Sequence, residues 1–297
     1  ATEGKRYILP NIFNKNKYNI TIGENVMGLP NENMGLNSKK PYLDNKNRKI
    51  TVPIMSDTKD IMIRKKFFDY LWNLASLGKL NLYFDINKNC IKPYDFKSSP
   101  TSEFNGYYLR IKKDKNEAAI IDMDIITSYK PELKKPLFID NVIGMDIERL
   151  EGHRYGRITK LHEVKDIINN ELFSKFLIPN FFTEPKDISI NDTTLKECIM
   201  IARNPLFNWF YKGYDNDIFH VIDKISLKLI KNSITNNFTE KVQHQFNIRI
   251  SFIEYFRGGE RKMADVMRDI RETLRKKINS GEYESIDELN FLASLLD

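Results

Sequence analysis

Cysteine is scarce in this sequence, with two among 297 residues. Cys90 and Cys198 lie far apart, and neither belongs to a CxxC pair or to a Cys/His group. Structural zinc motifs need closely spaced Cys and His, and disulfide-stabilised domains need more cysteines. The sequence therefore predicts neither a zinc motif nor a disulfide scaffold.

Long apolar runs are also missing. No stretch approaches the roughly 18–20 apolar residues that cross a bilayer, and the start carries no signal-peptide pattern. We therefore expect a cytoplasmic protein without a membrane partner.

Motifs for catalysis are absent as well. The chain contains no GxGxxG, no phosphate loop ending in GK[ST] and no GxSxG. The four histidines show no metal-ligand spacing, so we expect each to be a helix-surface or interface residue: His153, His162, His220 and His244.

One pair of carboxylates comes closest to a metal site. Asp122 and Asp124 alternate in "IDMDI", which places both on one face of a strand. No glutamate or histidine accompanies them, and an exposed strand face explains the pair equally well. The sequence therefore predicts no metal site, no cofactor and no enzyme.

The composition is that of a folded, basic protein. Hydrophobic residues make up 41% and aromatic residues 12%, enough for one large domain or two ordinary ones. The net charge is +7, and residues 1–55 hold nine Lys/Arg against four Asp/Glu. This excess favours a polyanionic partner, although similar values occur in proteins that bind no nucleic acid.

Hydrophobic periodicity predicts an α+β fold, with sheets in the first half and helices in the second. Alternation indicates a strand in residues 16–30, a strand in 79–86 and a hairpin in 106–127 around a polar turn. Helical spacing covers residues 58–78, 160–179, 194–204, 217–232, 240–256 and 260–279. We divide the chain into a basic α+β nucleic-acid-probing region (1–130), a mostly helical region (131–257) and the start of a C-terminal bundle (258–297).

The two ends suggest a piece of a longer chain. The sequence begins without a methionine, and it stops inside a helical pattern that follows a Ser285/Glu288 capping box. We therefore expect further residues beyond this span.

A basic segment near the start has the composition of a nucleic-acid contact. Between Asn37 and Lys49, five basic residues accompany a single acid, Asp44. Lysine and arginine contact phosphates, asparagine can bond a base edge, and tyrosine can stack on a base. A solvated loop has the same composition. The candidate binding residues are Asn37, Ser38, Lys39, Lys40, Tyr42, Asn45, Lys46, Asn47, Arg48 and Lys49.

Two segments resemble one protein family. "NMGLNSKKPYLDNKNRK" followed by "VPIMSDTKDIMIRKKFFDYL" resembles the large subunit of type I-B CRISPR surveillance complexes (Cascade), where a Gly-Asn-Lys loop precedes a helix with a basic-Phe-Phe pattern. The later "NIRISFIEYFRGGERKMADVMRDIRETLRKKI" is also similar to that family, where an Asn-(Leu/Ile)-Arg helix leads through glycines into a basic helix. The two matches occur in the family's order. Some relatives carry a cysteine zinc motif, which this span lacks.

The resemblance implies a non-catalytic subunit with nucleic-acid and protein partners. Such a subunit binds guide RNA and neighbouring subunits, reads the protospacer-adjacent motif in target double-stranded DNA, stabilises the opened strands and helps recruit a helicase-nuclease. Base pairing then reads most of the sequence, so the protein needs only a short readout element. On the basic side of the late helix the candidate contacts are Arg268, Arg271 and Arg275.

Two alternatives remain at the sequence level. The chain could be an RNA-binding or RNA-processing protein of a CRISPR locus, although cleavage needs an acid–base pair that the sequence does not reveal. It could also be a structural adaptor whose basic surfaces bind only protein.

Overall fold

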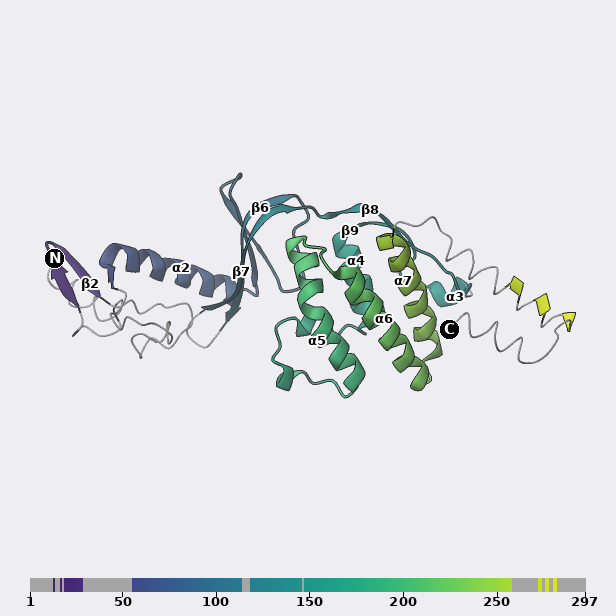
Figure 1. Cartoon of the computed structure of the whole chain (residues 1–297). Helices are drawn as coiled ribbons and strands as arrows, with labels where there is room; N and C mark the ends of the chain where they lie inside the picture. The colour runs from purple at the N-terminus through teal and green to yellow at the C-terminus, as the bar shows by residue number, and fades with distance from the viewer. Residues whose placement is uncertain are drawn as a thin grey trace. The chain divides into compact units, whose positions relative to one another are not determined.

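The computed structural model describes residues 13, 17, 19–28, 55–113, 118–145, 147–257 and six positions between 272 and 281. It confirms the α+β class, because strands dominate the N-terminal half and helices the C-terminal half (Figure 1). Two compact units form the chain. One comprises residues 1–98 and 104–127, and the other comprises residues 99–103 and 128–297.

The first unit is built on a four-stranded sheet in the order β5-β4-β6-β7. β4 (Asn81–Asp85) pairs antiparallel with both β5 (Cys90–Tyr94) and β6 (Phe104–Lys113). β7 (Ala118–Tyr129) is the edge strand beside β6, so the predicted hairpin is confirmed. A helix against this sheet completes the core.

That helix is α2 (Thr58–Ser76), which confirms the prediction for residues 58–78. It begins where the Asp57 carboxylate accepts a hydrogen bond from the backbone N–H of Asp60, which satisfies one of the free donors of the first turn. Its buried face packs Phe68 and Leu71 against Leu82 of β4 and Leu109 of β6. The helix therefore folds here because its apolar stripe covers one face of the sheet.

A second, three-stranded sheet lies in the same unit. β1 (Ile20–Ile22), β2 (Asn25–Gly28) and β3 (Ser56–Asp57) form antiparallel pairs in that order. The prediction of one strand over residues 16–30 is wrong, because the chain reverses at Gly23 and Glu24 and Ile22 pairs with Asn25. Alternation of side chains continues through a tight hairpin, so the sequence pattern did not reveal the turn.

The second unit consists of a strand pair and a helical array. β8 (Glu132–Ile139) pairs antiparallel with β9 (Gly156–Lys160), with a register irregularity between Glu132 and Leu137. This pair was not expected from the sequence. Two lysines and Pro136, which has no N–H to donate, hide the alternation of β8.

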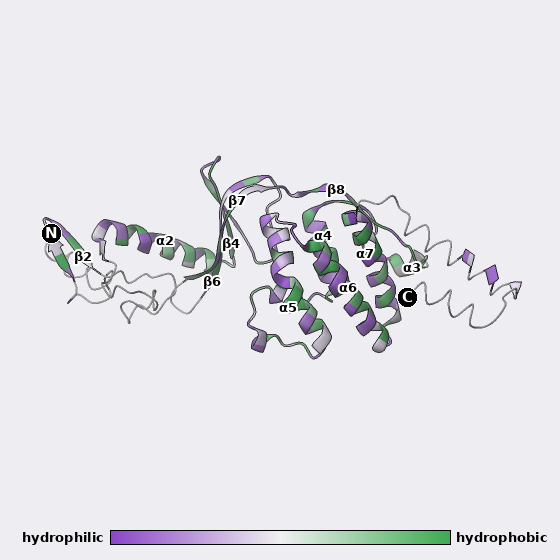
Figure 2. Cartoon of the chain, viewed as in Figure 1, coloured by the Kyte–Doolittle hydropathy of each residue, from purple (hydrophilic) through white to green (hydrophobic). Residues whose placement is uncertain are grey.

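Three helices stand side by side in this unit, with α6 between the other two (Figure 1). They are α5 (Thr193–Phe207), α6 (Ile218–Thr235) and α7 (Thr239–Arg257). Hydrophobic and hydrophilic residues alternate in patches along α6 and α7 (Figure 2), and the buried residues of α6 recur at helical spacing, as in Ile218, Ile222, Ile225 and Leu229.

The predicted end of the helix over residues 194–204 is wrong. α5 continues through Pro205 rather than stopping before it, and the π-helix η6 (Asn208–Lys212) follows directly. Burial of Leu206, Phe207 and Phe210 keeps the chain helical beyond the proline, so packing overrides the missing hydrogen bond.

The predicted helix over residues 160–179 is interrupted. It comprises α4 (Leu161–Ile167) and the π-helix η3 (Ile168–Leu172), after which Ser174 and Lys175 adopt left-handed backbone angles. The short helices α3 (Ile147–Leu150), η4 (Ile178–Asn180) and η5 (Pro185–Asp187) complete the unit. None of the described helices has an apolar stretch long enough to span a bilayer.

Candidate metal centre

A buried polar row on α7 organises the second unit. Asn247 is fully buried, and its Oδ1 accepts a hydrogen bond from the backbone N–H of Ile143 at 3.1 Å. One turn later, Ser251 Oγ accepts from the backbone N–H of Asp140 at 3.2 Å. Buried polar groups require such partners. These bonds therefore fix the chain between β8 and β9 against α7.

The same row holds a tyrosine and a histidine. The Tyr155 hydroxyl oxygen lies 2.8 Å from Nδ1 of His244 and accepts from Asn247 Nδ2 at 3.1 Å. His244, on α7, is only 2% exposed. Burial raises the pKa of Tyr155 above its ordinary value of 10.0, and the negative charge of Glu171 acts in the same direction. Tyr155 is therefore a neutral phenol that orients the His244 ring.

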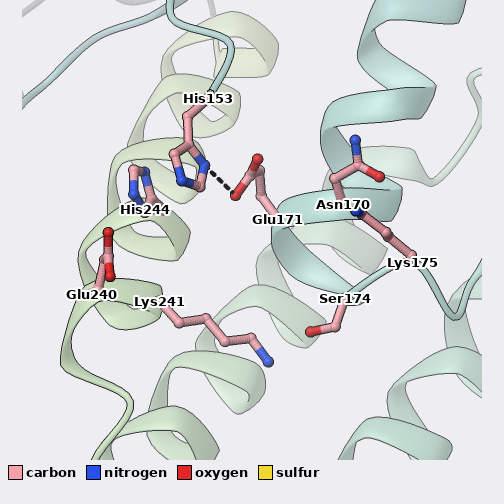
Figure 3. A pocket seen from close by; sticks show the side chains of 8 residues that line it. All are labelled: His153, Asn170, Glu171, Ser174, Lys175, Glu240, Lys241 and His244. Carbon is pink, nitrogen blue, oxygen red and sulfur yellow. Dashed lines mark hydrogen bonds and ion pairs between the residues drawn. The ribbon is translucent and has the colours of Figure 1, made fainter. Parts of the chain in front are cut away.

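A second histidine lies directly on the first. The rings of His153 and His244 stack with centroids 3.7 Å apart and an interplanar angle of 18°. His153 Nδ1 lies 2.9 Å from Oε2 of Glu171, as Figure 3 shows. The three residues come from different segments, namely the turn after α3, the π-helix η3 and α7. Single π-helical turns often occur at functional sites, because they displace a side chain from its regular helical position.

The group opens into a pocket of about 400 Å³. The pocket is also lined by Ser174, Lys175, Glu240 and Lys241, and Figure 3 shows the Lys241 side chain extending toward Ser174. Burial lowers the pKa of Lys241 below its ordinary value of 10.5, although Asp192 opposes this shift. The volume is that of a small-ligand site rather than of a packing defect.

Two kinds of chemistry use paired histidines, and the geometry separates them. An acid–base pair must reach a reacting group from two sides, at hydrogen-bonding distance. Two rings stacked 3.7 Å apart leave no room for a phosphate between them, and one of them is buried. Metal ligation instead needs ligand atoms gathered on one centre. One potential ligand atom from each of His153, Glu171 and His244 lies within 4.8 Å of the others, the one such group among the described residues. The described arrangement therefore brings a candidate metal-ligand set to one point, and one of the stacked rings must turn before both can bind the same ion.

This group was not predicted from the sequence. We expected each histidine to be a helix-surface or interface residue, whereas His244 is buried and stacks on His153. Linear spacing detects only ligands on one element, and here the ligands come from three. No local signal pointed to Glu171, because helical spacing runs without a break through residues 160–179 of the sequence and the π-helix appears only in the structure.

The residues that the sequence did propose lie elsewhere. Asn37–Lys49, Arg268, Arg271 and Arg275 lie outside the described residues. Asp122 and Asp124 are half-buried on β7. The other two histidines do not belong to the group of His153, Glu171 and His244, which we call the His153 group. His162 lies on α4, and His220 is exposed on α6.

In the two segments that resemble the CRISPR family, several of the described side chains stabilise the fold. In the basic-Phe-Phe pattern of α2, Phe68 is buried in the core and Phe67 packs against it. In the Asn-Ile-Arg pattern of α7, Arg249 forms an ion pair with Asp223 at 2.6 Å and donates to Ser226 Oγ at 2.8 Å. The contacts of Arg249 therefore link α7 to α6. Both sequence patterns contribute to folding in this chain.

Comparison with known proteins gives no further assignment: no family model, curated protein or solved structure matches the chain.

Proposed function

We propose that the chain is a non-catalytic large subunit of an RNA-guided CRISPR surveillance complex. In this role it recognises the protospacer-adjacent motif in duplex DNA, stabilises the opened strands and helps recruit a helicase-nuclease. Its partners are guide RNA, target double-stranded DNA and the other subunits. The observation that carries the proposal is the pair of resembling segments, residues 33–71 and 247–278, which occur in the family's order.

The strands that flank the basic segment support this assignment. β2 ends at Gly28 and β3 begins at Ser56, and these two residues pair across the antiparallel ladder. The chain between them therefore leaves and returns at one place on a small sheet. Thr58 Oγ1 also donates to the Val26 carbonyl oxygen at 3.0 Å, which anchors the start of α2 to β2. Binding residues are commonly carried by connections that begin and end on such a scaffold.

The test is binding of matched target DNA by the assembled complex, with the correct and with an altered adjacent motif. Asparagines that bond base edges act on one motif only, so Asn37→Ala or Asn45→Ala should cost about 1–3 kcal/mol on the correct motif and little on the altered one. Lysines act through charge. Replacing Lys39, Lys40 and Lys46 together by Ala should weaken both DNAs similarly and reduce the salt slope by about one unit per lost contact.

A charge-matched variant controls for net charge. Lys186, Lys224 and Lys231 are exposed in the second unit, and replacing all three by Ala removes the same charge outside the segment. This control should leave motif discrimination unchanged. If the asparagine variants and the Lys39/Lys40/Lys46 variant bind both DNAs as tightly as the unmodified complex, the basic segment is not the readout element.

The two alternative functions, an RNA-binding protein and a protein-only adaptor, predict different results in a binding assay. An RNA-binding protein would retain RNA in filter binding without any partner subunit, whereas a protein-only adaptor would retain neither RNA nor DNA in any assembly. Affinity for duplex DNA that requires the guide RNA and the partner subunits is the outcome expected here.

A further inference from the structure

The side chains of His153, Glu171 and His244 form a ligand set of a recognised type. Two imidazoles and one carboxylate bind zinc and other first-row transition metals, and three protein ligands leave a coordination position for water or an external group. The three candidate ligand atoms all lie within 4.8 Å of one another. Ligands about 2.0–2.2 Å from a tetrahedral zinc ion lie roughly 3.4 Å apart. The longest separations in the set must therefore contract around an ion, while the 2.9 Å contact between His153 Nδ1 and Glu171 Oε2 must lengthen.

One ring must turn for this contraction. A metal ion binds imidazole in the plane of the ring, and stacked rings 18° from parallel cannot both direct a lone pair at one ion. His244 is 2% exposed and held by Tyr155, whereas the His153 side chain is 29% exposed and lies in a turn. His153 is therefore the ring that rotates, while His244 provides the fixed ligand.

The neighbours of His244 allow the tautomer that a metal requires. The Tyr155 oxygen already accepts a hydrogen bond from Asn247, and its own proton can be donated to Met145 Sδ at 4.0 Å. Tyr155 can then accept from Nδ1–H of His244 at 2.8 Å, and in this tautomer Nε2 carries no proton and can ligate an ion. Outer partners of this kind orient metal-bound histidines.

We propose that His153, Glu171 and His244 form a binding site for a divalent transition-metal ion of the zinc type, open to the pocket. The ion connects the turn after α3, the π-helix η3 and α7, so it stabilises the second unit by an amount that grows with the logarithm of its free concentration above the dissociation constant. The remaining coordination position is open to the pocket, from which water or an external group can bind the ion. This site is independent of the proposed role in target recognition.

The experiment is a calorimetric Zn²⁺ titration of the metal-stripped 297-residue chain, paired with visible absorption after Co²⁺ addition. The variants are His153→Gln and Glu171→Gln, which alter half-buried side chains, and Tyr155→Phe, which removes the outer hydroxyl. His220→Gln is the matched control, because His220 is an exposed helical histidine outside the group. Melting curves without metal establish that each variant is folded.

The expected result is one ion per chain and a Co²⁺ absorption band that Zn²⁺ abolishes. His153→Gln and Glu171→Gln should each weaken binding at least about tenfold, Tyr155→Phe about 10- to 100-fold, and His220→Gln not at all. The melting temperature should rise with Zn²⁺ in the unmodified chain and in His220→Gln. The proposal is overturned if the chain takes up no ion, or if binding in folded His153→Gln and Glu171→Gln equals that of the unmodified chain. If one variant does not fold, the other and the Co²⁺ spectrum of the unmodified chain decide.

Discussion

At the scale of single residues, Asn81 determines the polar centre of the first unit. It is fully buried, and its Oδ1 accepts hydrogen bonds from the Tyr108 hydroxyl and from Nη1 of Arg110, both at 2.8 Å. Its Nδ2 donates to the Asp95 carbonyl oxygen at 2.8 Å. One amide on β4 therefore bonds groups on β6 and on the segment after β5, which sequence periodicity treats as separate.

Asn81→Ala should destabilise the chain by about 2–4 kcal/mol, because it removes three hydrogen bonds of a buried amide and each contributes about 0.5–1.5 kcal/mol. Urea unfolding followed by circular dichroism measures this loss. Asn105→Ala is the control, since Asn105 is exposed on the neighbouring strand β6, and its replacement should stay within about 0.5 kcal/mol. Equal stability of the two variants would show that the Asn81 network contributes nothing.

At the scale of elements, the pairing of β4 with β6 depends on a glycine. Gly106 lies opposite Asp85 in the register and has φ +155°, and a Cβ added there would overlap the Phe84 carbonyl oxygen. Gly78, which follows α2, also has a positive φ (+75°), but a Cβ there would meet nothing within 4 Å. Both positions have a backbone angle that residues with a Cβ rarely adopt, but only at Gly106 would the added Cβ overlap a neighbouring atom.

Gly106→Ala should therefore destabilise the protein more than Gly78→Ala. Both substitutions cost about 1–2 kcal/mol from the backbone angle. The overlap at Gly106 should add a further 1–3 kcal/mol or so, the range for overpacked sites. Denaturant midpoints of the two variants, measured side by side, test this prediction. An equal or reversed order would mean that the overlap at Gly106 is relieved without loss of stability, because β4 and β6 can move apart.

At the scale of the whole molecule, the proposed role requires partners for any DNA cleavage. The purified chain should degrade neither DNA nor RNA and should not hydrolyse nucleotides, because its sequence contains no nucleophile, phosphate-loop or nuclease motif. Gel assays with Mg²⁺, Mn²⁺ and Zn²⁺ measure this.

Variants identify the source of any activity that appears. Metal-dependent cleavage that co-purifies and disappears in an Asp122→Ala, Asp124→Ala double variant would contradict the non-catalytic assignment. Loss of cleavage in His153→Gln would contradict it too, and would identify the His153 group as the active site. Cleavage that persists in both variants but separates from the chain on further chromatography comes from a contaminant, and cleavage that stays with the chain also contradicts the assignment.

Much of the architecture follows from the sequence because it depends on local periodicity. The stripe of Ile61, Phe68, Leu71 and Ala75 identifies α2, and the β6–β7 hairpin follows from two β-rich arms around a polar turn. Errors arose where packing overrides local preference, as at Pro205 and at the interruption after Leu172. The division into a sheet-rich and a helical half is likewise visible in the order of the patterns.

What the sequence determined by itself is therefore the α+β class, the principal helices, the basic character of the first 55 residues and the resemblance of two segments to a CRISPR family. Only the tertiary structure brought His153, Glu171 and His244 together, and only it gave His244 the Tyr155 partner. The physical reason is that periodicity reports which face of an element is buried, whereas a site depends on which faces meet. That meeting is decided by the buried polar row of α7 and by the π-helical turn, and neither has a local sequence signature.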